Sequence, residues 1–260
     1  MLMSAVPPAL KIGLQLYSLR NEISADLEGS LQKIAAIGYG KLEAAGYANG
    51  RFYGMDPRDF RAMVENYGMQ LTASHLTFGE NETQQVIEAH KAAGVKYLVW
   101  PWIGKEDRES IVALENLAVK FNRLGSLCNE NGLFFGYHNH DFEFIPVEGR
   151  LPYDILLENT DPALVFMEID LYWITYAGKD PLAYFGKHPG RFRLWHVKDM
   201  MAGEEREMTE VGSGIIDYNA LFTYSELAGM EEFFVEQDVI RGDAFESVRK
   251  SHDYLESILK

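Results

Sequence analysis

The sequence predicts an α/β protein with a single domain that folds as a (β/α)8 barrel. Short strand-like runs alternate with longer helix-like stretches, most strand-like runs end in polar residues, and no dinucleotide-binding glycine turn follows the first run. These three observations together carry the prediction. The strand-like runs occupy residues 11–17, 41–45, 70–75, 97–101, 133–138, 164–170, 192–198 and 233–237.

The helical stretches between these runs begin and end with recognisable residues. Asp56-Pro57 and Asp180-Pro181 each combine a capping carboxylate with a proline suited to the first helical position. Glycines that can adopt a positive φ end four helical stretches: Gly38, Gly68, Gly94 and Gly132. No linker interrupts the pattern, so we expect one barrel domain over residues 11–260, preceded at 1–10 by an N-terminal extension or an expression remnant.

An open, doubly wound sheet is the alternative architecture, because hydrophobic periodicity does not separate it from a barrel. The segment SLRNEISAD after the first strand has no G-x-G-x-x-G turn to hold a pyrophosphate. Polar residues at the carboxyl ends of the strands are typical of a barrel, which builds its active site there. The barrel is therefore favoured.

Composition excludes several classes of partner. A net charge of −15 repels nucleic acid and anionic membrane surfaces. No run approaches the roughly 20 apolar residues that a membrane span needs. With Cys128 as the only cysteine, no intramolecular disulfide can form, which favours the cytoplasm, or the periplasm if an export signal has been removed.

Imidazoles and carboxylates gather at the predicted strand ends. Four of the seven histidines belong to this group. Any one of these residues alone would read as a satisfied polar group of the core, but their repetition at several strands predicts a shared metal or acid/base site. The group consists of Glu43, His75, His138, His140, Asp170, His196 and Glu236.

The best metal-ligand candidates are Asp170, His196 and Glu236, at equivalent places on the last three strands. Mixed carboxylate and imidazole ligands suit Mn²⁺, Mg²⁺, Co²⁺ or Zn²⁺. His138 is the predicted fourth ligand. Glu168 should point inward one layer deeper, where a structural hydrogen bond is its expected role.

Four residues are candidates for the chemistry itself. His138 and His140 share one face of an extended segment, so each could serve as a metal ligand, as an acid or base, or as both. Glu236 is the candidate base. Lys198, two residues beyond His196, could stabilise an enolate, or form an ordinary salt bridge.

The remaining candidates would contact the substrate. Trp102 and Trp173 offer flat walls for the C–H face of a sugar, although packing of the upper barrel explains each ring equally well. Glu43 and His75 lie at strand ends. Glu143 lies in a loop, either as a solvated carboxylate or as an acceptor for a substrate hydroxyl. We expect a small-molecule sugar or polyol as partner, and the sequence is compatible with a homo-oligomer.

Several short motifs resemble the xylose isomerase-like TIM barrel superfamily, in its branch of sugar phosphate isomerases and epimerases. The resemblance covers essentially the whole chain. It rests on IGLQLYSLR, LEAAG, YHNHDFEF, EIDLYW, WHVKDM, VGSGIIDY and VEQD. In ketose epimerases of this superfamily, Glu, Asp, His and Glu from the fifth to eighth strands hold a divalent metal, usually manganese.

The resemblance transfers the last three ligands to Asp170, His196 and Glu236. The fifth-strand glutamate is absent, and His138 and His140 stand there instead. The resemblance therefore implies a divalent-metal-dependent isomerase or epimerase that acts on a small ketose or keto-sugar through an enediolate, but not the family's proton transfer between two glutamates. The turn within 212–217 resembles the family's Gly-x-Gly turn, which helps to shape the pocket.

Other functions fit the same residues. If the enediolate expels a β-substituent, the enzyme is a metal-dependent dehydratase or lyase for a keto-polyol or keto-glycoside. The missing fifth-strand glutamate also allows a carbohydrate-binding barrel without catalysis. An abasic-site endonuclease is disfavoured, because the chain is acidic and has too few ligands for a three-metal cluster.

Overall fold

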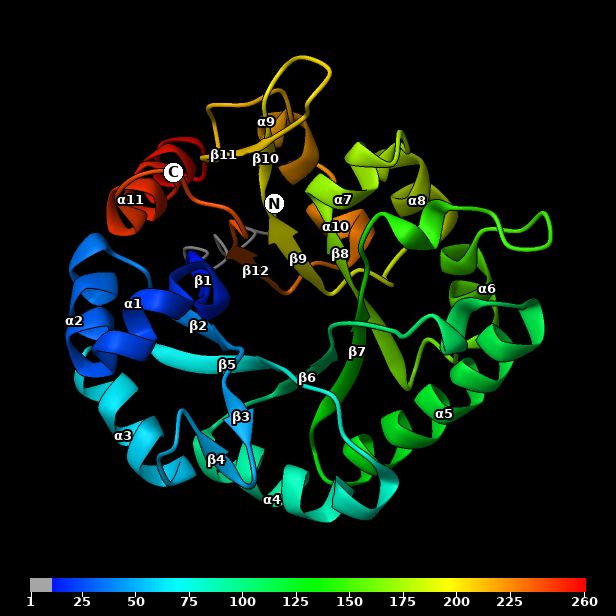
Figure 1. Cartoon of the computed structure of the whole chain (residues 1–260), viewed down its shortest axis with the longest axis horizontal. Helices are drawn as coiled ribbons and strands as arrows, with labels where there is room; N and C mark the ends of the chain where they lie inside the picture. Colours follow the sequence, from blue (N-terminus) through cyan, green and yellow to red (C-terminus); the bar gives the residue numbers. More distant parts are fainter. Residues whose placement is uncertain (1–10) are drawn as a thin grey trace, which may run out of the picture.

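Eight parallel strands close into a barrel in the computed structural model, which describes residues 11–260 (Figure 1). Each strand pairs with the next barrel strand along the chain, and β12 closes the ring on β1. All eight predicted strands are confirmed, and residues 1–10 lie outside the described part of the chain. The barrel strands are β1 Gly13–Gln15, β2 Lys41–Ala44, β5 Gln70–His75, β6 Tyr97–Trp100, β7 Phe134–His138, β8 Val165–Asp170, β9 Leu194–Val197 and β12 Glu232–Val235.

Helices surround the barrel on its outer side (Figure 1). The α-helices are α1 Arg20–Ala25, α2 Leu27–Ile37, α3 Pro57–Asn66, α4 Thr83–Ala93, α5 Ile111–Glu130, α6 Pro152–Asn159, α7 Leu171–Tyr176, α8 Pro181–Lys187, α9 Tyr218–Phe222, α10 Ser225–Ala228 and α11 Ala244–Ile258. Short 3-10 turns occupy Leu16–Leu19, Glu80–Glu82, Glu106–Arg108 and Phe142–Phe144.

The expected helix boundaries are present. The Asp56 and Asp180 side chains accept hydrogen bonds from the amides of Arg58 and Leu182, which caps α3 and α8. The four glycines expected to end helices all have positive φ, from 76° at Gly132 to 121° at Gly38.

Two short hairpins decorate the barrel, and the strand pattern did not predict them. The strands β3 Tyr47–Ala48 and β4 Arg51–Phe52 pair after β2, and β10 Asp199–Met200 pairs with β11 Met208–Thr209 after β9. Both hairpins follow carboxyl ends of barrel strands, so they extend the end of the barrel where the polar candidates lie.

The barrel interior changes from apolar to polar along its axis. One buried apolar cluster fills the lower interior, with Tyr97, Phe166 and Phe234 as its large members. Gly136 makes room for this packing, because a Cβ there would lie 2.4 Å from the Phe166 ring. Above this cluster the inward positions carry carboxylates and imidazoles, such as Glu168 and His196, which are fully buried.

Across residues 11–260, the structure contains no helix with the length and apolar character needed to cross a membrane.

Candidate metal centre

Four predicted ligands converge at the carboxyl ends of four neighbouring strands. His138 ends β7, Asp170 ends β8, His196 lies in β9, and Glu236 directly follows β12. One ligand atom from each residue lies within 4.8 Å of the other three. All four side chains are buried, between 0% and 4% exposed, so they form a compact group of the kind that could hold one metal ion.

Asp170 has one carboxylate oxygen that the protein leaves without a hydrogen bond. It ends β8 and caps α7, where Oδ1 accepts the amide of Trp173 at 2.8 Å. Oδ2 is buried and lacks a hydrogen bond, although the Lys198 ammonium lies 3.0 Å and His138 Nε2 3.7 Å away from it. Burial raises the pKa of Asp170 to about 6 even though the Lys198 ammonium opposes this shift, so the site can stabilise this carboxylate further with a second cation. The residues present therefore fit a divalent metal.

Lys198 places an ammonium beside the same carboxylates. Its Nζ lies 2.5 Å from Glu236 Oε2, 3.0 Å from Asp170 Oδ2 and 2.9 Å from Asp238 Oδ2. Burial opposes the charge on Lys198, but Asp170, Asp238 and Glu236 outweigh it and hold the pKa of the ammonium well above its usual value. Burial also opposes the charge on Glu236, yet Lys198 and His196 hold the pKa of that carboxyl well below its usual range. Glu236 is therefore an ionised carboxylate in direct contact with a cation.

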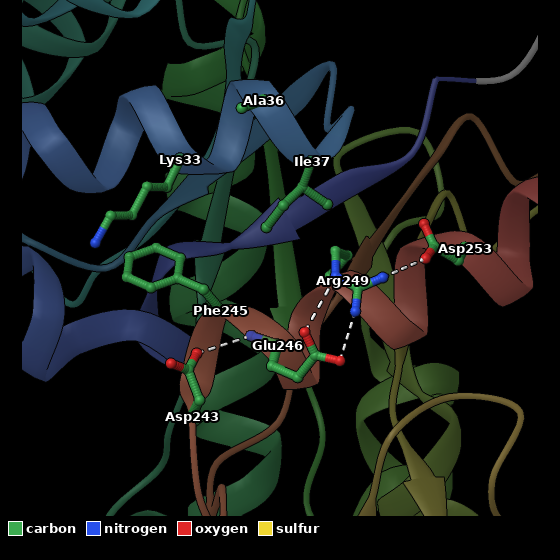
Figure 2. A pocket seen from close by; sticks show the side chains of 8 residues that line it. All are labelled: Lys33, Ala36, Ile37, Asp243, Phe245, Glu246, Arg249 and Asp253. Atoms are coloured by element: carbon green, nitrogen blue, oxygen red, sulfur yellow. Dashed lines mark hydrogen bonds and ion pairs between the residues drawn. The ribbon is translucent and has the colours of Figure 1, made fainter.

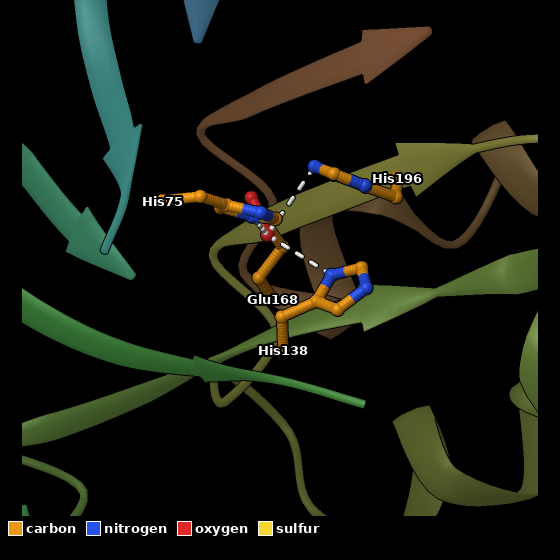
Figure 3. A group of neighbouring side chains, drawn as sticks. All are labelled: His75, His138, Glu168 and His196. Carbon is orange, nitrogen blue, oxygen red and sulfur yellow. Dashed lines mark hydrogen bonds and ion pairs between the residues drawn. The ribbon is translucent and has the colours of Figure 1, made fainter. Parts of the chain in front are cut away.

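A second group of side chains surrounds the Glu168 carboxylate and shares two histidines with the first group (Figure 3). The Oε2 atom of Glu168 is 2.6 Å from His75 Nε2, 3.1 Å from His138 Nδ1 and 3.3 Å from His196 Nε2. These four residues form a second group whose candidate ligand atoms lie within 4.8 Å of one another. The deeper, hydrogen-bonded position expected for Glu168 is observed.

Glu43 belongs to the same lower layer. Its Oε2 lies 2.6 Å from His196 Nε2 and accepts the side-chain amide of Gln15 at 2.9 Å. Burial and the nearby Glu168 carboxylate raise the pKa of Glu43 to about 7. Glu43 was predicted to bind substrate, but its fully buried side chain contacts a predicted metal ligand from below and does not line the pocket.

A pocket of about 700 Å³ opens above the ligand group. Seven predicted residues line it: His75, Trp102, His138, His140, Trp173, Lys198 and Glu236. Trp102 is 51% exposed, and its ring meets the His140 ring edge-on at 5.0 Å. Imidazoles, an ammonium and a carboxylate therefore share one cavity with two exposed or half-buried indole rings.

His140 is a neutral imidazole in this pocket. Burial and the nearby Lys198 ammonium lower its pKa to about 3. Its Nδ1 is buried without a hydrogen-bond partner. His140 is thus available to exchange a hydrogen bond with a bound molecule, but it is not a cation at neutral pH.

Glu143 supports His140 from behind. It lies in the 3-10 turn after β7, where its carboxylate accepts the hydroxyl of Tyr137 and, at 2.8 Å, the backbone amide of His140. Glu143 is fully buried, which raises its pKa to about 8. One of the two sequence interpretations was a solvated carboxylate, but the structure buries Glu143. The carboxylate faces Tyr137 and His140 and does not line the pocket.

Asp199 organises the loop after β9, a role that the sequence did not reveal. Its carboxylate accepts the amides of Met200, Gly212, Gly214 and Ile216 at 2.8–3.1 Å. A Cβ on Gly214 would lie 2.2 Å from Asp199 Oδ1, so the close approach requires glycine there. The Gly-x-Gly turn was the sequence signal that could have revealed this role, because such a turn can point its backbone amides at a nearby acceptor such as a carboxylate.

A second hollow, of about 710 Å³, lies outside the barrel between α2 and α11 (Figure 2). Its charged groups already pair with one another: Arg249 lies 2.5 Å from Glu246 and 3.0 Å from Asp253. The Lys33 ammonium lies over the Phe245 ring at 4.6 Å. None of its eight lining residues, all in the described range, is a histidine, so this hollow lacks the chemistry of the barrel mouth.

Comparison with known proteins gives relatives of two kinds. An inosose dehydratase from Geobacillus thermodenitrificans is 33% identical over 153 residues, which cover 52% of this chain and 51% of that protein. The chain thus spans about half the length of the curated relatives it matches.

Two crystal structures, both described as a sugar phosphate isomerase/epimerase from Parabacteroides distasonis, match almost completely. One has a TM-score of 0.84 and 29% identity and covers 96% of this chain and 100% of that chain. The other has a TM-score of 0.85 and 28% identity, with coverage of 100% and 98%. The sequence model described as "Xylose isomerase-like TIM barrel" matches residues 31–256. With a closed eight-stranded barrel and a buried group of histidines and carboxylates at its mouth, this chain belongs to the xylose isomerase-like TIM barrel family.

Proposed function

We propose that the protein is a divalent-metal-dependent sugar isomerase that moves a proton between neighbouring carbons of a small ketose or keto-sugar. The observation that carries this proposal is the position of Glu236. Its ionised carboxylate belongs to the ligand group, contacts the Lys198 ammonium at 2.5 Å and lines the pocket. A base beside both a metal site and a fixed cation suits removal of a proton next to a carbonyl.

The metal would be held by His138, Asp170, His196 and Glu236. When bound, a divalent cation polarises a carbonyl oxygen and makes the adjacent C–H more acidic. Mn²⁺, Mg²⁺, Co²⁺ and Zn²⁺ all accept this mixture of nitrogen and oxygen ligands.

Glu236 takes the proton from the carbon next to the carbonyl, which leaves an enediolate. The Lys198 ammonium is close enough to Glu236 to stabilise the negative oxygen that develops beside it. Glu236 then returns the proton to the neighbouring carbon on the same face of the substrate. The hydroxyl proton moves at the same time to the former carbonyl oxygen, and the Lys198 ammonium beside Glu236 is the group available to relay it. One carboxylate is sufficient for the transfer between the two carbons.

Epimerisation demands more, because a proton must reach the opposite face of the same carbon. His140 from the β7 side is the available partner, but its pKa of about 3 keeps it neutral, so it would have to relay a proton without first carrying a charge. The pair His138 and His140 therefore supports epimerisation less directly than Glu236 supports isomerisation. His138 has one nitrogen near Asp170 and the other near Glu168.

The pocket walls would recognise the sugar. His75 and His140 offer ring nitrogens to hydroxyl groups, while Trp102 and Trp173 offer flat faces to the C–H side of the ring. The two isomerase/epimerase structures from Parabacteroides distasonis, which match nearly the whole chain, support a sugar as the substrate class.

The test combines metal analysis with solvent isotope exchange. Purified protein loaded with Mn²⁺, Co²⁺, Mg²⁺ or Zn²⁺ is incubated with ketoses and keto-sugars in D₂O, and deuterium at the carbon next to the carbonyl is measured by NMR. We expect metal-dependent exchange that disappears in Glu236→Gln and persists in Glu207→Gln, a control at a rim glutamate paired with Arg241. Stoichiometric metal without exchange on any substrate would instead favour a carbohydrate-binding barrel.

A dehydratase is the second candidate, and Lys198 favours it. When Glu236 takes the proton as base, it loses one of the negative charges that raise the pKa of Lys198. The neighbouring ammonium then gives its proton to the β-hydroxyl that the intermediate expels, which leaves as water. The curated relatives named inosose dehydratase match over about half their length. The loss of one water from a keto-polyol, or of an alcohol from a keto-glycoside, read by mass spectrometry, distinguishes this lyase chemistry from isomerisation.

A further inference from the structure

The two predicted histidine ligands use both of their ring nitrogens. His138 directs Nε2 toward Asp170 Oδ2 at 3.7 Å and Nδ1 toward Glu168 Oε2 at 3.1 Å. His196 directs Nδ1 toward Glu236 Oε2 at 2.8 Å and Nε2 toward Glu43 Oε2 at 2.6 Å. Each ring therefore spans the space between the ligand group and the carboxylates below it.

We infer that Glu43 and Glu168 are positioning residues that set opposite tautomers on the two ligands, so that His138 binds the metal through Nε2 and His196 through Nδ1. This inference rests on the metal site of the proposed function. A carboxylate only accepts hydrogen bonds, so the ring nitrogen facing Glu43 or Glu168 carries a proton. The nitrogen of His196 that faces Glu236 would lose its proton to the metal, because Glu236 and this nitrogen belong to the same ligand group. The other nitrogen of each ring then presents its lone pair to the metal.

The two lower carboxylates are themselves incomplete without a cation. Glu43 and Glu168 are fully buried, and Oε1 of each has no hydrogen-bond partner. Buried carboxylates with an unpaired oxygen are costly. A divalent charge on the far side of the two imidazoles offsets this cost, because the rings transmit its polarisation to the carboxylates beneath.

A second metal in the lower group is the competing explanation, because its four candidate ligand atoms also lie within 4.8 Å of one another. The distances argue against it. His75 Nε2 and His138 Nδ1 approach the same oxygen of Glu168 at 2.6 and 3.1 Å, which are hydrogen-bond distances around a central acceptor (Figure 3). With both sites filled, His138 and His196 would have to lose both ring protons.

His75 extends this lower layer to the pocket. It lines the cavity, contacts Glu168, and stacks on His196 with ring centroids 5.0 Å apart and planes 9° apart. Glu168 thus connects one pocket-lining imidazole with two metal ligands, so its loss should disturb the metal more than its distance from the pocket would indicate.

The first experiment reads the tautomers directly in unmodified protein. Long-range ¹H–¹⁵N NMR of the Zn²⁺-loaded, ¹⁵N-histidine-labelled chain should show zinc on Nε2 of His138 and Nδ1 of His196, with protons on the opposite nitrogens. Zinc on the same type of nitrogen in both rings overturns the inference. So does a wild-type protein that binds no metal. Neither reading requires turnover, so an inactive protein with the expected tautomers removes the proposed isomerase and leaves this inference standing.

The second experiment compares Glu43→Gln and Glu168→Gln with Glu232→Gln, a buried glutamate at the opposite end of the barrel. Metal affinity is measured by competition with a chelating dye, and ligand geometry by the visible spectrum of the Co²⁺ form. We expect Glu43→Gln and Glu168→Gln each to bind metal about 10- to 100-fold more weakly than wild type, with an altered Co²⁺ spectrum, and we expect Glu232→Gln to match wild type. Unchanged affinity and spectrum in both variants overturn the inference, as do two metal equivalents in the wild type with one lost in Glu168→Gln.

Discussion

The two ends of the barrel both bury carboxylates, but they satisfy them differently. At the strand starts, the buried Glu232 contacts Lys41 Nζ at 2.9 Å and Thr72 Oγ1 at 2.5 Å, and the exposed Glu231 beside it accepts Arg193 Nε at 2.5 Å. Donors therefore face both oxygens of Glu232, one from Lys41 and one from Thr72. This end has the composition of a structural ion-pair network.

At the strand ends, the carboxylates keep oxygens that the protein does not satisfy. Glu43 and Glu168 each retain a buried oxygen without a hydrogen bond, and the groups that face them are mainly imidazoles. The free oxygen of Asp170 lies 3.0 Å from the Lys198 ammonium, which two other carboxylates share. The contrast teaches that burial of charge by itself does not mark a functional site. The incomplete pairing at the mouth marks the candidate site, because a bound divalent cation would complete the pairing.

The largest effect should come from removing the base at the mouth. Glu236→Gln should lower kcat by about a hundred- to ten-thousand-fold, because the amide keeps the shape but cannot accept a proton. Steady-state kinetics on the substrate identified by isotope exchange gives the number, and a thermal melt should show an intact fold. Activity within a few-fold of wild type would show that Glu236 is not the base. It would also contradict the proposal that the strand ends, and not the strand starts, carry the function.

The next largest effect should come from removing the metal. Free metal at a thousandfold excess over its Kd stabilises the native state by about 4 kcal/mol, so chelated protein should unfold at a clearly lower temperature. Calorimetry with chelator, and again after Mn²⁺ is restored, measures the shift. The same Tm with and without metal would mean that the unpaired oxygens of Asp170, Glu43 and Glu168 have no cation to bind.

A histidine outside the mouth gives a third point of comparison. His90 in α4 is fully buried, its Nδ1 lies 2.7 Å from the Val86 carbonyl, and its Nε2 lies 3.2 Å from Ser74 Oγ. Burial lowers its pKa to about 4, from an ordinary 6.5. Below pH 6.5 the imidazole of His90 becomes protonated in the unfolded chain but stays neutral in the folded chain. Its burial therefore lowers the free energy of unfolding by about 3 kcal/mol as the pH falls toward 4.

Denaturant unfolding between pH 7 and 4 should therefore show a shallower loss of stability in His90→Gln than in wild type, both measured with chelator present. The variant starts from a lower stability because it loses packing, so the slopes are compared and not the absolute values. Equal slopes would show that His90 does not remain neutral in the folded state.

The smallest effect should come from the end of the barrel where the strands start, because donors already face both oxygens of Glu232 there. Glu232→Gln should cost about 1 kcal/mol in chemical denaturation, because a charge-assisted pair to Lys41 becomes a neutral one while Thr72 keeps a partner. A loss of metal binding in Glu232→Gln would contradict the proposal that the strand starts are structural and that the strand ends hold the metal.

The strand order and the location of the polar group followed from the sequence because both depend on local patterns. Short apolar runs rich in β-branched and aromatic residues predict strands, and glycines that can adopt a positive φ predict helix ends. Alternation along FMEID separates Glu168 from Asp170 by one layer. The parallel barrel then brings distant strand ends such as His138 and Glu236 together.

The hydrogen-bond partners of the buried carboxylates could not be predicted from the sequence, because they depend on the register between strands and on the paths of the loops. Glu43 and His196 are 153 residues apart, and no local pattern reveals their contact. Asp199 acts through backbone amides, which every residue carries, and Glu143 is buried by a turn whose path the sequence does not determine. The two hairpins are too short to generate a strand pattern.

The double use of the His138 ring constrains how this barrel can evolve. Position 138 is one of two at which this chain has histidine on the strand where the family has glutamate. A glutamate there would put a second anion next to Glu168, at the point where an imidazole nitrogen now lies 3.1 Å away. Like charges at that separation inside a protein repel strongly. Positions 138 and 168 should therefore change together across homologues, with an acidic residue at only one of them, and a single exchange in the laboratory should fail unless its neighbour is exchanged as well.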